Sequence, residues 1–390
     1  MEPTNPFVPQ YDSDSSLLGR EAEQEAIRVA LETPAGRIAL VAPRRMGLST
    51  LLQVVTNRLR SRAHVRVAYA QLDVAADSYD AGQRLFSAVG QALGTGGREL
   101  LLEAANRFGP PFTVRRGETG DEWFELRELR GRARDFDTFR LLQAVNDALD
   151  HRKETLGIVV DDFGALLNAS NRGAWSLKAA VEQHHRISYV FGSSEGAPLM
   201  ARFQSPESGL WRAILVMELQ PIPRPVLVAW LMERFGQSGR IASQEAIERL
   251  VGIAGPRTGD VVGLAGTVWA RAMAMREVAP DDIAGAQLEM VRNRDSQYLA
   301  AWRRLTTTKR RILTAMVTQQ ALAPTSTEAM RRFHLGPKSS VHRAVHELMR
   351  DATIVRQGDS EWLVDDPFFG EWIRGRVISP VAGAKPPRLE

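Results

Sequence analysis

The sequence predicts an α/β protein whose parallel sheet is covered by helices on both faces and is followed by helical domains. Short continuous apolar runs alternate with amphipathic stretches as far as Leu219, which is typical of buried parallel strands connected by helices. Two of these runs end in polar residues, Asp161-Asp162 and Gly192-Ser193-Ser194. Strand patterns then stop, and helical periodicity continues to a hairpin-like stretch near the C-terminus.

The expected elements of the first part alternate along the chain. The strands are four apolar runs, at residues 37–41, 65–72, 156–160 and 187–191. The helices lie before and between them, at residues 21–31, 51–59, 82–93 and 136–149. The segment 94–134 is polar, charged and punctuated by glycine, so we expect an insertion with some helix there.

The second part is predicted to be helical up to a C-terminal hairpin. Six helices are expected, at residues 224–235, 243–254, 258–275, 306–319, 327–333 and 338–348. Two short strands between Thr353 and Val364 complete the helix-helix-helix-hairpin order of a winged helix. The expected parts are an N-terminal arm at 1–16, an α/β core at 17–220, a helical lid at 221–300, a winged helix at 301–376 and a tail at 377–390.

Composition excludes several classes of protein. The 390 residues are 44% hydrophobic and 25% charged, and no apolar run reaches the roughly 18 residues that a membrane helix needs. The first 16 residues lack the basic and apolar regions of a signal peptide. Cysteine is absent, which excludes disulfides, thiol catalysis and cysteine-ligated zinc. We therefore expect a cytoplasmic protein without membrane association.

The basic residues are concentrated towards the C-terminus. The net charge is +4, and residues 302–376 carry 13 Lys/Arg against 8 Asp/Glu. This local excess favours contact with a polyanion, with an ordinary solvated surface as the alternative.

The stretch from Ala42 to Thr50 has the arrangement of a phosphate-binding loop. In the Walker A pattern, GxxxxGK[ST], backbone N–H groups wrap the phosphates and the N-terminus of the next helix faces them. Gly47 and Ser49 occupy their expected positions, whereas Ala42 replaces the first glycine and Leu48 replaces the lysine. The context favours the loop, because an apolar strand precedes it and a helix follows.

Together with other motifs, this loop resembles the AAA+/STAND-type P-loop ATPases related to archaeal and bacterial origin-recognition proteins. APRRMGLSTLL resembles that family's GPRRMGKTSLL loop, IVVDDF its Walker B strand and YVFGSSE its sensor 1 strand. NPFVP, LLGREAE, LWRAILVMELQPI and GIAGPRTGDVVGLAGTVW are similar to its N-terminal, arginine-bearing and sensor 2 elements. LTTTKRRILTAMV and WLVDDPFFGEWI resemble its C-terminal winged helix. The resemblance implies an AAA+-type P-loop NTPase fold with an all-α lid and a winged-helix domain.

The resemblance also implies a site for ATP or ADP with Mg²⁺. The nucleotide-contacting positions would be Gly19, Arg20, Pro43, Arg44, Arg45, Met46, Gly47, Leu48, Ser49 and Thr50. Ser49 would ligate Mg²⁺ directly and Asp161 through a water. Asp162 stands where a glutamate orients the attacking water, and Ser193 or Ser194 corresponds to sensor 1. Arg212 and Arg257 would be the arginine finger and sensor 2, which stabilise charge on the γ-phosphate.

Two departures from the family pattern weaken the predicted catalysis. Leu48 cannot supply the lysine's charge-assisted hydrogen bond, which is worth about 1.5–3 kcal/mol. Asp162 is one methylene shorter than glutamate, and a shift of about 1 Å in such a group costs roughly 100-fold in rate. Arg44 or Arg45 is an alternative phosphate ligand, because a guanidinium matches phosphate well. Hydrolysis, binding without efficient hydrolysis and a vestigial empty site all remain open.

The third helix of the winged-helix pattern presents a basic, hydroxyl-bearing face. Val341, Val345 and Leu348 form its apolar stripe. The outward residues, with one arginine of the expected wing, are the candidate DNA contacts: Lys338, Ser339, Ser340, His342, Arg343, His346 and Arg356. Such a helix fits a DNA major groove, and packing or oligomer contacts are the alternative use.

The sequence therefore supports two functions. The first is a nucleotide-binding AAA+/STAND-like protein with weak or absent ATP hydrolysis that binds DNA and forms homo-oligomers. The second is a non-catalytic pseudo-ATPase scaffold or regulator that engages a protein partner, in transposition or defence. Whether the chain is an enzyme depends on a loop that lacks its lysine.

Overall fold

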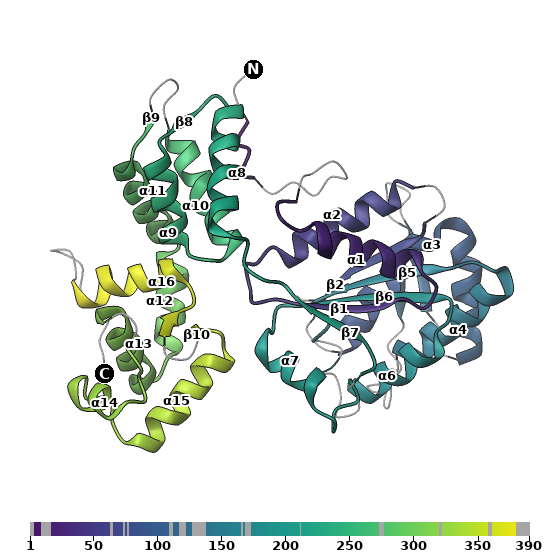
Figure 1. Cartoon of the computed structure of the whole chain (residues 1–390). Helices are drawn as coiled ribbons and strands as arrows, with labels where there is room; N and C mark the ends of the chain where they lie inside the picture. The colour runs from purple at the N-terminus through teal and green to yellow at the C-terminus, as the bar shows by residue number, and fades with distance from the viewer. Residues whose placement is uncertain are drawn as a thin grey trace. The chain divides into compact units, whose positions relative to one another are not determined.

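The chain divides into two compact units, which are described separately. The computed structural model describes residues 4–8, 17–62, 65–72, 75, 78–108, 112–116, 122–126, 138–164, 167, 173–210, 212–272, 277–319, 322–357 and 361–379. The sheet unit spans Pro9–Ile222, and the helical unit combines Met1–Val8 with Pro223–Glu390 (Figure 1).

The sheet unit is built on five parallel strands in the order β2-β5-β6-β1-β7. Their bounds are Arg37–Val41 for β1, Val67–Gln71 for β2, Leu156–Asp161 for β5, Ile187–Ser193 for β6 and Leu215–Glu218 for β7. Because β6 lies between β1 and β5, the carboxyl ends of these three strands meet at one edge. That edge carries the phosphate loop, Asp161 and Ser193, so the predicted parallel sheet is confirmed.

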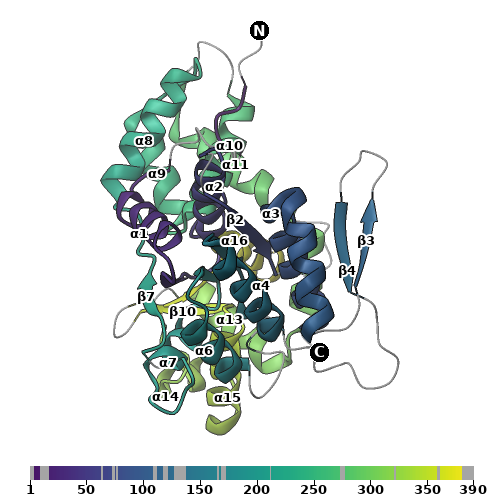
Figure 2. The same cartoon turned by 90° about the vertical axis from the view of Figure 1, so that its right-hand side faces the viewer.

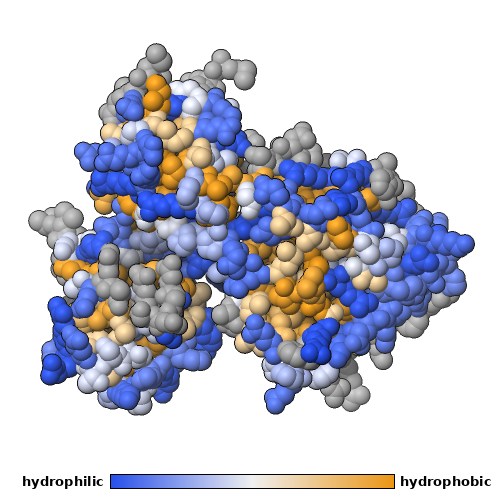
Figure 3. All heavy atoms as spheres, viewed as in Figure 1, coloured by the Kyte–Doolittle hydropathy of each residue, from blue (hydrophilic) through white to orange (hydrophobic). Residues whose placement is uncertain are grey.

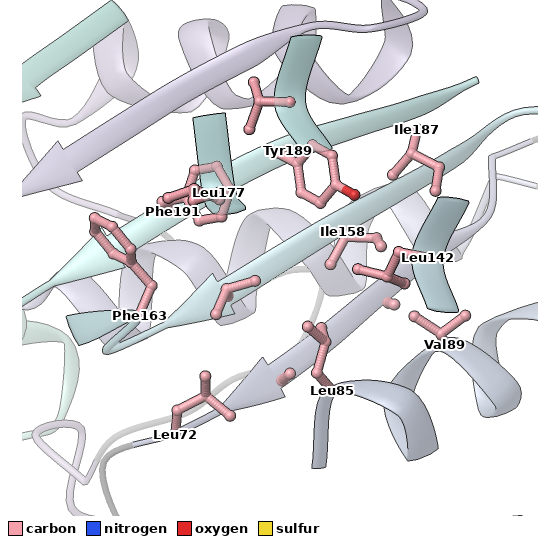
Figure 4. Close-up of a cluster of buried hydrophobic side chains, with 14 of the residues drawn as sticks. Leu72, Leu85, Val89, Leu142, Ile158, Phe163, Leu177, Ile187, Tyr189 and Phe191 are labelled. Carbon is pink, nitrogen blue, oxygen red and sulfur yellow. The ribbon is translucent and has the colours of Figure 1, made fainter. Parts of the chain in front are cut away.

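Helices cover both faces of this sheet, and alternate strand residues pack into two separate cores. On one face, α1 (Glu21–Glu32) and α2 (Leu48–Arg60) pack against Ile38 and Leu40 of β1. On the other face, Ala39 and Val41 join residues of the remaining helices. Those helices are α3 (Ser78–Phe108), α4 (Thr138–Arg152), α6 (Gly173–Gln183) and α7 (Ala197–Gln204). Figure 4 shows the second core, and alternation along β1 explains why one strand supplies both.

A buried histidine lies in the loop just before β6. His184 is 1% exposed, and its Nδ1 lies 2.6 Å from the hydroxyl of Tyr189, which itself packs in the second core. Burial lowers the pKa of His184 to about 4. The imidazole is therefore neutral at physiological pH and serves the structure of the unit.

The predicted insertion contains more regular structure than expected. The span α3 consists of two helical segments, which meet at a kink at Gly94, where φ is 65° and ψ is −158°, and the second segment ends at Phe108. An antiparallel hairpin follows, formed by β3 (Phe112–Arg116) and β4 (Glu122–Leu126), and Figure 2 shows it. The hairpin was not predicted, because charged residues alternate with its apolar ones in a short segment. The other insertion residues lie outside the described residues.

The first part of the helical unit is the expected all-α region. Its helices are α8 (Arg224–Gln237), α9 (Gln244–Ala254), α10 (Thr258–Arg271) and α11 (Pro280–Asn293). A two-residue parallel pairing of β8 (Ile241–Ala242) with β9 (Glu277–Val278) was not expected. Phe7 packs into this region, 4% exposed, with its ring centroid 5.0 Å from that of Phe235.

The second part of the helical unit is a winged helix. Its elements are α12 (Asp295–Arg304), α13 (Thr307–Thr318), α14 (Thr327–Arg332), α15 (Lys338–Arg350), β10 (Ile354–Gln357), β11 (Glu361–Val364), α16 (Pro367–Ile373) and a π-helical turn (Arg374–Ile378). The Ser326 hydroxyl caps α14 by accepting from Ala329 N at 3.1 Å. Trp302, Phe369 and Trp372 pack together and join the first and last helices. Within the described residues, no helix has both the length and the hydrophobicity needed to cross a membrane.

Candidate nucleotide and nucleic-acid sites

The loop between β1 and α2 has the backbone of a phosphate cradle. Arg45 and Gly47 both have positive φ, 67° and 83°, and no side chain caps the first turn of α2 among the described residues. Residues with positive φ in a tight loop turn backbone N–H groups towards a common point, and the N–H groups of an uncapped helix end point the same way. The Arg44 and Ser49 side chains are exposed at this edge. The loop therefore offers donors to an anion without the Walker lysine.

Leu48, at the lysine position, faces the protein core. It is 6% exposed and belongs to the apolar cluster with Met46, Leu51 and Leu52. A Cβ placed on Gly192 would lie 3.6 Å from Leu48 Cδ2, so the leucine packs against the end of β6. Met46 is also buried, and these two residues can meet a nucleotide only through their backbone.

Ser49 and Asp161 come together although they belong to different motifs. The Ser49 hydroxyl donates to the Asp161 carboxylate, and the Tyr69 hydroxyl donates to its Oδ2 at 2.9 Å. Asp161 is 1% exposed; burial raises the pKa of this carboxyl above its usual value, and the two hydrogen bonds oppose the rise. This pair has the ligand types that Mg²⁺ prefers, a hydroxyl and a carboxylate beside a phosphate site. Tyr69 was missed from the sequence, because nothing in a strand residue marks it as a partner of Asp161.

Asp162 stands at the position of the water-orienting acid, and its carboxylate is hydrogen-bonded to Ser194 after the end of β6. Its Oδ1 accepts from the backbone N–H of Ser194 at 3.0 Å and from the Ser194 hydroxyl at 2.7 Å. The residue has a positive φ of 55°. Ser193 is buried, and its hydroxyl accepts from Glu195 N at 3.2 Å. Both serines thus fix the end of β6.

Glu195 is a site residue that the sequence reading missed. Its backbone pairs with Pro43 of the phosphate loop in an isolated antiparallel bridge. Its Oε1 would lie 2.3 Å from a Cβ on Gly164, so the carboxylate extends over the turn that follows Asp162. The available signal was a third polar residue after the two serines of the β6 end.

Gly19 and Arg20 hold the segment that leaves β7. Arg20 is 6% exposed; its Nη1 lies 2.9 Å from Glu23 Oε1 and donates to the Gln220 carbonyl at 2.9 Å. Gly19 has φ 60°, and a Cβ there would lie 3.5 Å from Ile222. Among the described residues, Arg20 Nη2 is buried without a hydrogen-bond partner. An acceptor on a ligand would satisfy that donor.

The candidate arginine finger, Arg212, and the candidate sensor 2, Arg257, have different surroundings. Arg212 is exposed in the turn before β7, with φ 55°. Arg257 is 8% exposed at the start of α10 and forms a salt bridge with Asp365, which precedes α16. The guanidinium expected to act as sensor 2 therefore already has a buried partner inside the helical unit.

The outer face of α15 is basic and exposed. Lys338, Ser339, His342, Arg343 and His346 are exposed, and Ser340 is half-buried. Val341, Val345 and Leu348 are buried, as the periodicity predicted.

Two further charged residues lie near this face, Glu347 on α15 and Arg356 on the wing. Glu347 is bound by Lys309 at 2.9 Å, which lowers the pKa of the glutamate and compensates its charge. Arg356 is exposed on β10, and its guanidinium lies 5.8 Å from the centre of the Trp362 ring. The α15 face therefore presents cationic and hydroxyl groups, and the one acid of this helix, Glu347, is paired with Lys309.

The chain has the fold of an AAA+-type P-loop NTPase, followed by an all-α region and a C-terminal winged helix. Residues 296–375 match the family model described as a probable winged helix domain. No curated protein matches this chain.

Solved structures resemble the chain over almost its whole length. The Walker-type ATPase of Pyrococcus abyssi has a TM-score of 0.63 at 16% identity and covers 94% of this chain and 99% of its own. The Orc1 protein of Aeropyrum pernix, solved in complex with DNA, has a TM-score of 0.53 at 15% identity, with 94% and 95% covered. The Orc2 protein of Aeropyrum pernix has a TM-score of 0.54 at 13% identity, with 92% and 93% covered. The chain thus has the fold of the origin-recognition-like ATPases, which confirms the resemblance stated from the motifs.

Proposed function

We propose that this chain binds ATP or ADP with Mg²⁺ in its phosphate loop, hydrolyses ATP weakly or not at all, and binds DNA through α15. One observation carries the nucleotide site: the Ser49 hydroxyl donates to the Asp161 carboxylate beside an uncapped helix N-terminus. Ser49 and Asp161 would hold the Mg²⁺, and the ion would neutralise phosphate charge. The backbone N–H groups of residues 44–50 would hold the phosphates.

Weak hydrolysis follows from two side chains that are not available to the reaction. Leu48 is buried against β6 and supplies no charge to the phosphates. Asp162 is held by two hydrogen bonds to Ser194, so its carboxylate orients the end of β6. A water-orienting acid must reach the water at hydrogen-bond distance, and a carboxylate held elsewhere does so poorly.

The α15 face supports DNA binding. A helix that follows a short helix and turn, with its apolar side buried, is the element that enters the major groove in winged-helix and helix-turn-helix proteins. Lys338 and Arg343 can contact phosphates, while Ser339, His342 and His346 can reach base edges. The resemblance to an Orc1 protein solved with DNA agrees with this use of the domain.

A titration with fluorescent ADP and ATP, with and without Mg²⁺, tests the nucleotide site. We expect saturable binding to the native chain, and a loss of at least about tenfold in Mg²⁺-dependent affinity in Ser49→Ala, because one metal ligand is removed. Ser205→Ala, in the turn after α7, is the matched control and should bind as the native chain does. Phosphate release at saturating ATP then measures turnover separately.

A non-catalytic scaffold is the second candidate, and one observation favours it. The edge strand β7 exposes Leu215, 66% accessible, and Figure 3 shows apolar surface among the polar residues on the visible face of the sheet unit. Such an edge suits a protein partner or a second copy of the chain. Arg212 would then reach a neighbour from the turn before β7. Failure of both the native chain and Leu48→Lys to bind nucleotide at about 1 mM would favour this candidate.

A further inference from the structure

Glu195 lies where three motifs of the phosphate site meet. Its backbone pairs with Pro43 in the phosphate loop, its N–H donates to Ser193 at the end of β6, and its carboxylate extends over Gly164. Glycine at 164 leaves room for this carboxylate, because a Cβ would stand 2.3 Å from Oε1. Among the described residues, Glu195 has no ion-pair partner, and its side chain is exposed at the edge. The charge is therefore available to a ligand.

The Glu195 carboxylate lies between the phosphate loop and the turn that follows β5. In P-loop sites the α- and β-phosphates lie over the loop and the helix start, and the metal bridges the β- and γ-oxygens. Here the metal position is marked by Ser49 and Asp161. Gly164 follows Asp161, the last residue of β5, by three residues, so the Glu195 carboxylate lies on the Asp161 side of the phosphate loop.

The charge balance at the γ-phosphate end of the site differs from that of an ordinary Walker A site. The lysine that neutralises the β- and γ-phosphates is replaced by a buried leucine, and Glu195 adds a negative charge. Asp162 keeps its carboxylate directed at Ser194. A bound β-phosphate would still meet backbone N–H groups, whereas a γ-phosphate would approach the Glu195 carboxylate.

We propose that Glu195 sets the specificity of this site for nucleoside diphosphates over nucleoside triphosphates. The inference rests on the proposed nucleotide function and adds its ligand preference. Without Mg²⁺, ATP places its terminal phosphate near Glu195, and like charges repel. ADP has no γ-phosphate, so it does not approach Glu195. Its phosphates would bind only the backbone N–H groups at the start of α2. Mg²⁺ held by Ser49 and Asp161 would offset part of the negative charge at this end, and the discrimination would become smaller.

Equilibrium titrations of the full chain with fluorescent ADP and ATP, in EDTA and in Mg²⁺, measure this preference. In EDTA the native chain is expected to bind ADP about tenfold more tightly than ATP, which corresponds to a screened like-charge repulsion of about 1.4 kcal/mol. Glu195→Gln is expected to bring the two affinities within about twofold of each other by tightening ATP alone. Glu195→Ala should do the same, and thermal melting confirms that each variant is folded.

Glu182→Gln is the matched control. Glu182 is exposed near the end of α6, before β6 begins, and therefore lies at the opposite edge of the sheet. It should keep the native ratio. An unchanged ratio in both Glu195 variants, an equal change for both nucleotides, or a native preference for ATP would overturn the role of Glu195. Absence of binding by either nucleotide to the native chain and to Leu48→Lys would instead overturn the nucleotide function itself.

Discussion

The phosphate loop and the outer face of α15 are both proposed to bind phosphate, but they use different groups. At the loop, the side chain that ordinarily carries charge is Leu48, which is buried, so the donors are backbone N–H groups and a metal. On α15, the donors are exposed side chains, and the nearby Glu347 is compensated by Lys309. Binding at the loop should therefore depend on divalent cations, and binding at α15 on ionic strength.

Two arginines of the helical unit, Arg257 and Arg343, show a similar difference between a buried and an exposed charged side chain. Arg257 was predicted as a phosphate-sensing arginine, yet it is buried and paired with Asp365, while Arg343 in the same unit is exposed. A charged residue in a motif can thus stabilise the fold or bind a ligand. Whether it already has a partner inside the protein distinguishes these two roles. Four variants or conditions test this distinction, from the largest expected effect to the smallest.

Loss of the Arg257 side chain should destabilise the helical unit most. Arg257→Ala removes one partner of the Arg257–Asp365 pair, and breaking comparable buried pairs costs about 3–5 kcal/mol. Urea denaturation followed by hydrogen exchange in α10 and α16 measures the loss. Arg249→Ala, an exposed arginine of α9, should change stability by less than about 0.5 kcal/mol. Equal stability of the two variants would mean that the pair is not structural.

Acidification should destabilise the sheet unit through His184. The folded-state pKa of about 4 lies below the usual 6.5, so the unfolded state binds the proton more readily. The stabilisation is complete above pH 6.5 and is lost as pH falls towards 4, by about 3 kcal/mol in total. Unfolding free energies of the native chain and His184→Gln across this range measure the difference, with the exposed His151→Gln as the control. Parallel curves for the native chain and His184→Gln would refute the assignment.

Removal of two cations from α15 should weaken DNA binding by about 30-fold. The slope of log affinity against log salt concentration should become shallower by the amount expected for about two lost phosphate contacts. The variant is Lys338→Ala/Arg343→Ala, measured by mobility shift or anisotropy over a range of salt concentrations. Arg249→Ala/Arg292→Ala removes the same charge from exposed positions of the lid helices and should have little effect. If both double variants lose affinity equally, the net charge and not the α15 face binds DNA.

Restoring the Walker lysine should have a smaller and mixed effect. Leu48→Lys is expected to tighten ATP binding by about tenfold through a charge-assisted hydrogen bond. Because position 48 is packed against β6, the same variant should lower the melting temperature of the ligand-free chain. Leu48→Met, which keeps the apolar volume, should retain both the stability and the affinity of the native chain. Tighter binding by Leu48→Met would show that charge is not the missing element.

The sequence predicted most of the fold because its strands are continuous apolar runs and its motifs lie in a fixed order. Strands β1, β5 and β6, helix α14 and the wing lie within one or two residues of the expected positions. The β3–β4 hairpin was missed, since its alternation is short and rich in charge.

The surroundings of the site residues could not be predicted in the same way. The absence of lysine at position 48 is visible in the sequence, but the burial of Leu48 against β6 depends on tertiary packing. The partner of Arg257 lies 108 residues away, and Glu195 meets Pro43 only when the two strands are side by side. Contacts between residues far apart in the sequence leave no local pattern in it. The sequence therefore identifies candidate residues, and only the fold shows which residues they contact.

Backbone hydrogen exchange of residues 44–50, measured with and without saturating ADP and Mg²⁺, tests the account most directly. A site that holds phosphates through loop and helix N–H groups predicts slower exchange there on adding ADP, in the native chain as well as in Leu48→Lys. Ser49→Ala should reduce that protection when Mg²⁺ is present. Unchanged exchange across residues 44–50 at about 1 mM ADP would contradict the claim that this loop binds nucleotide without its lysine.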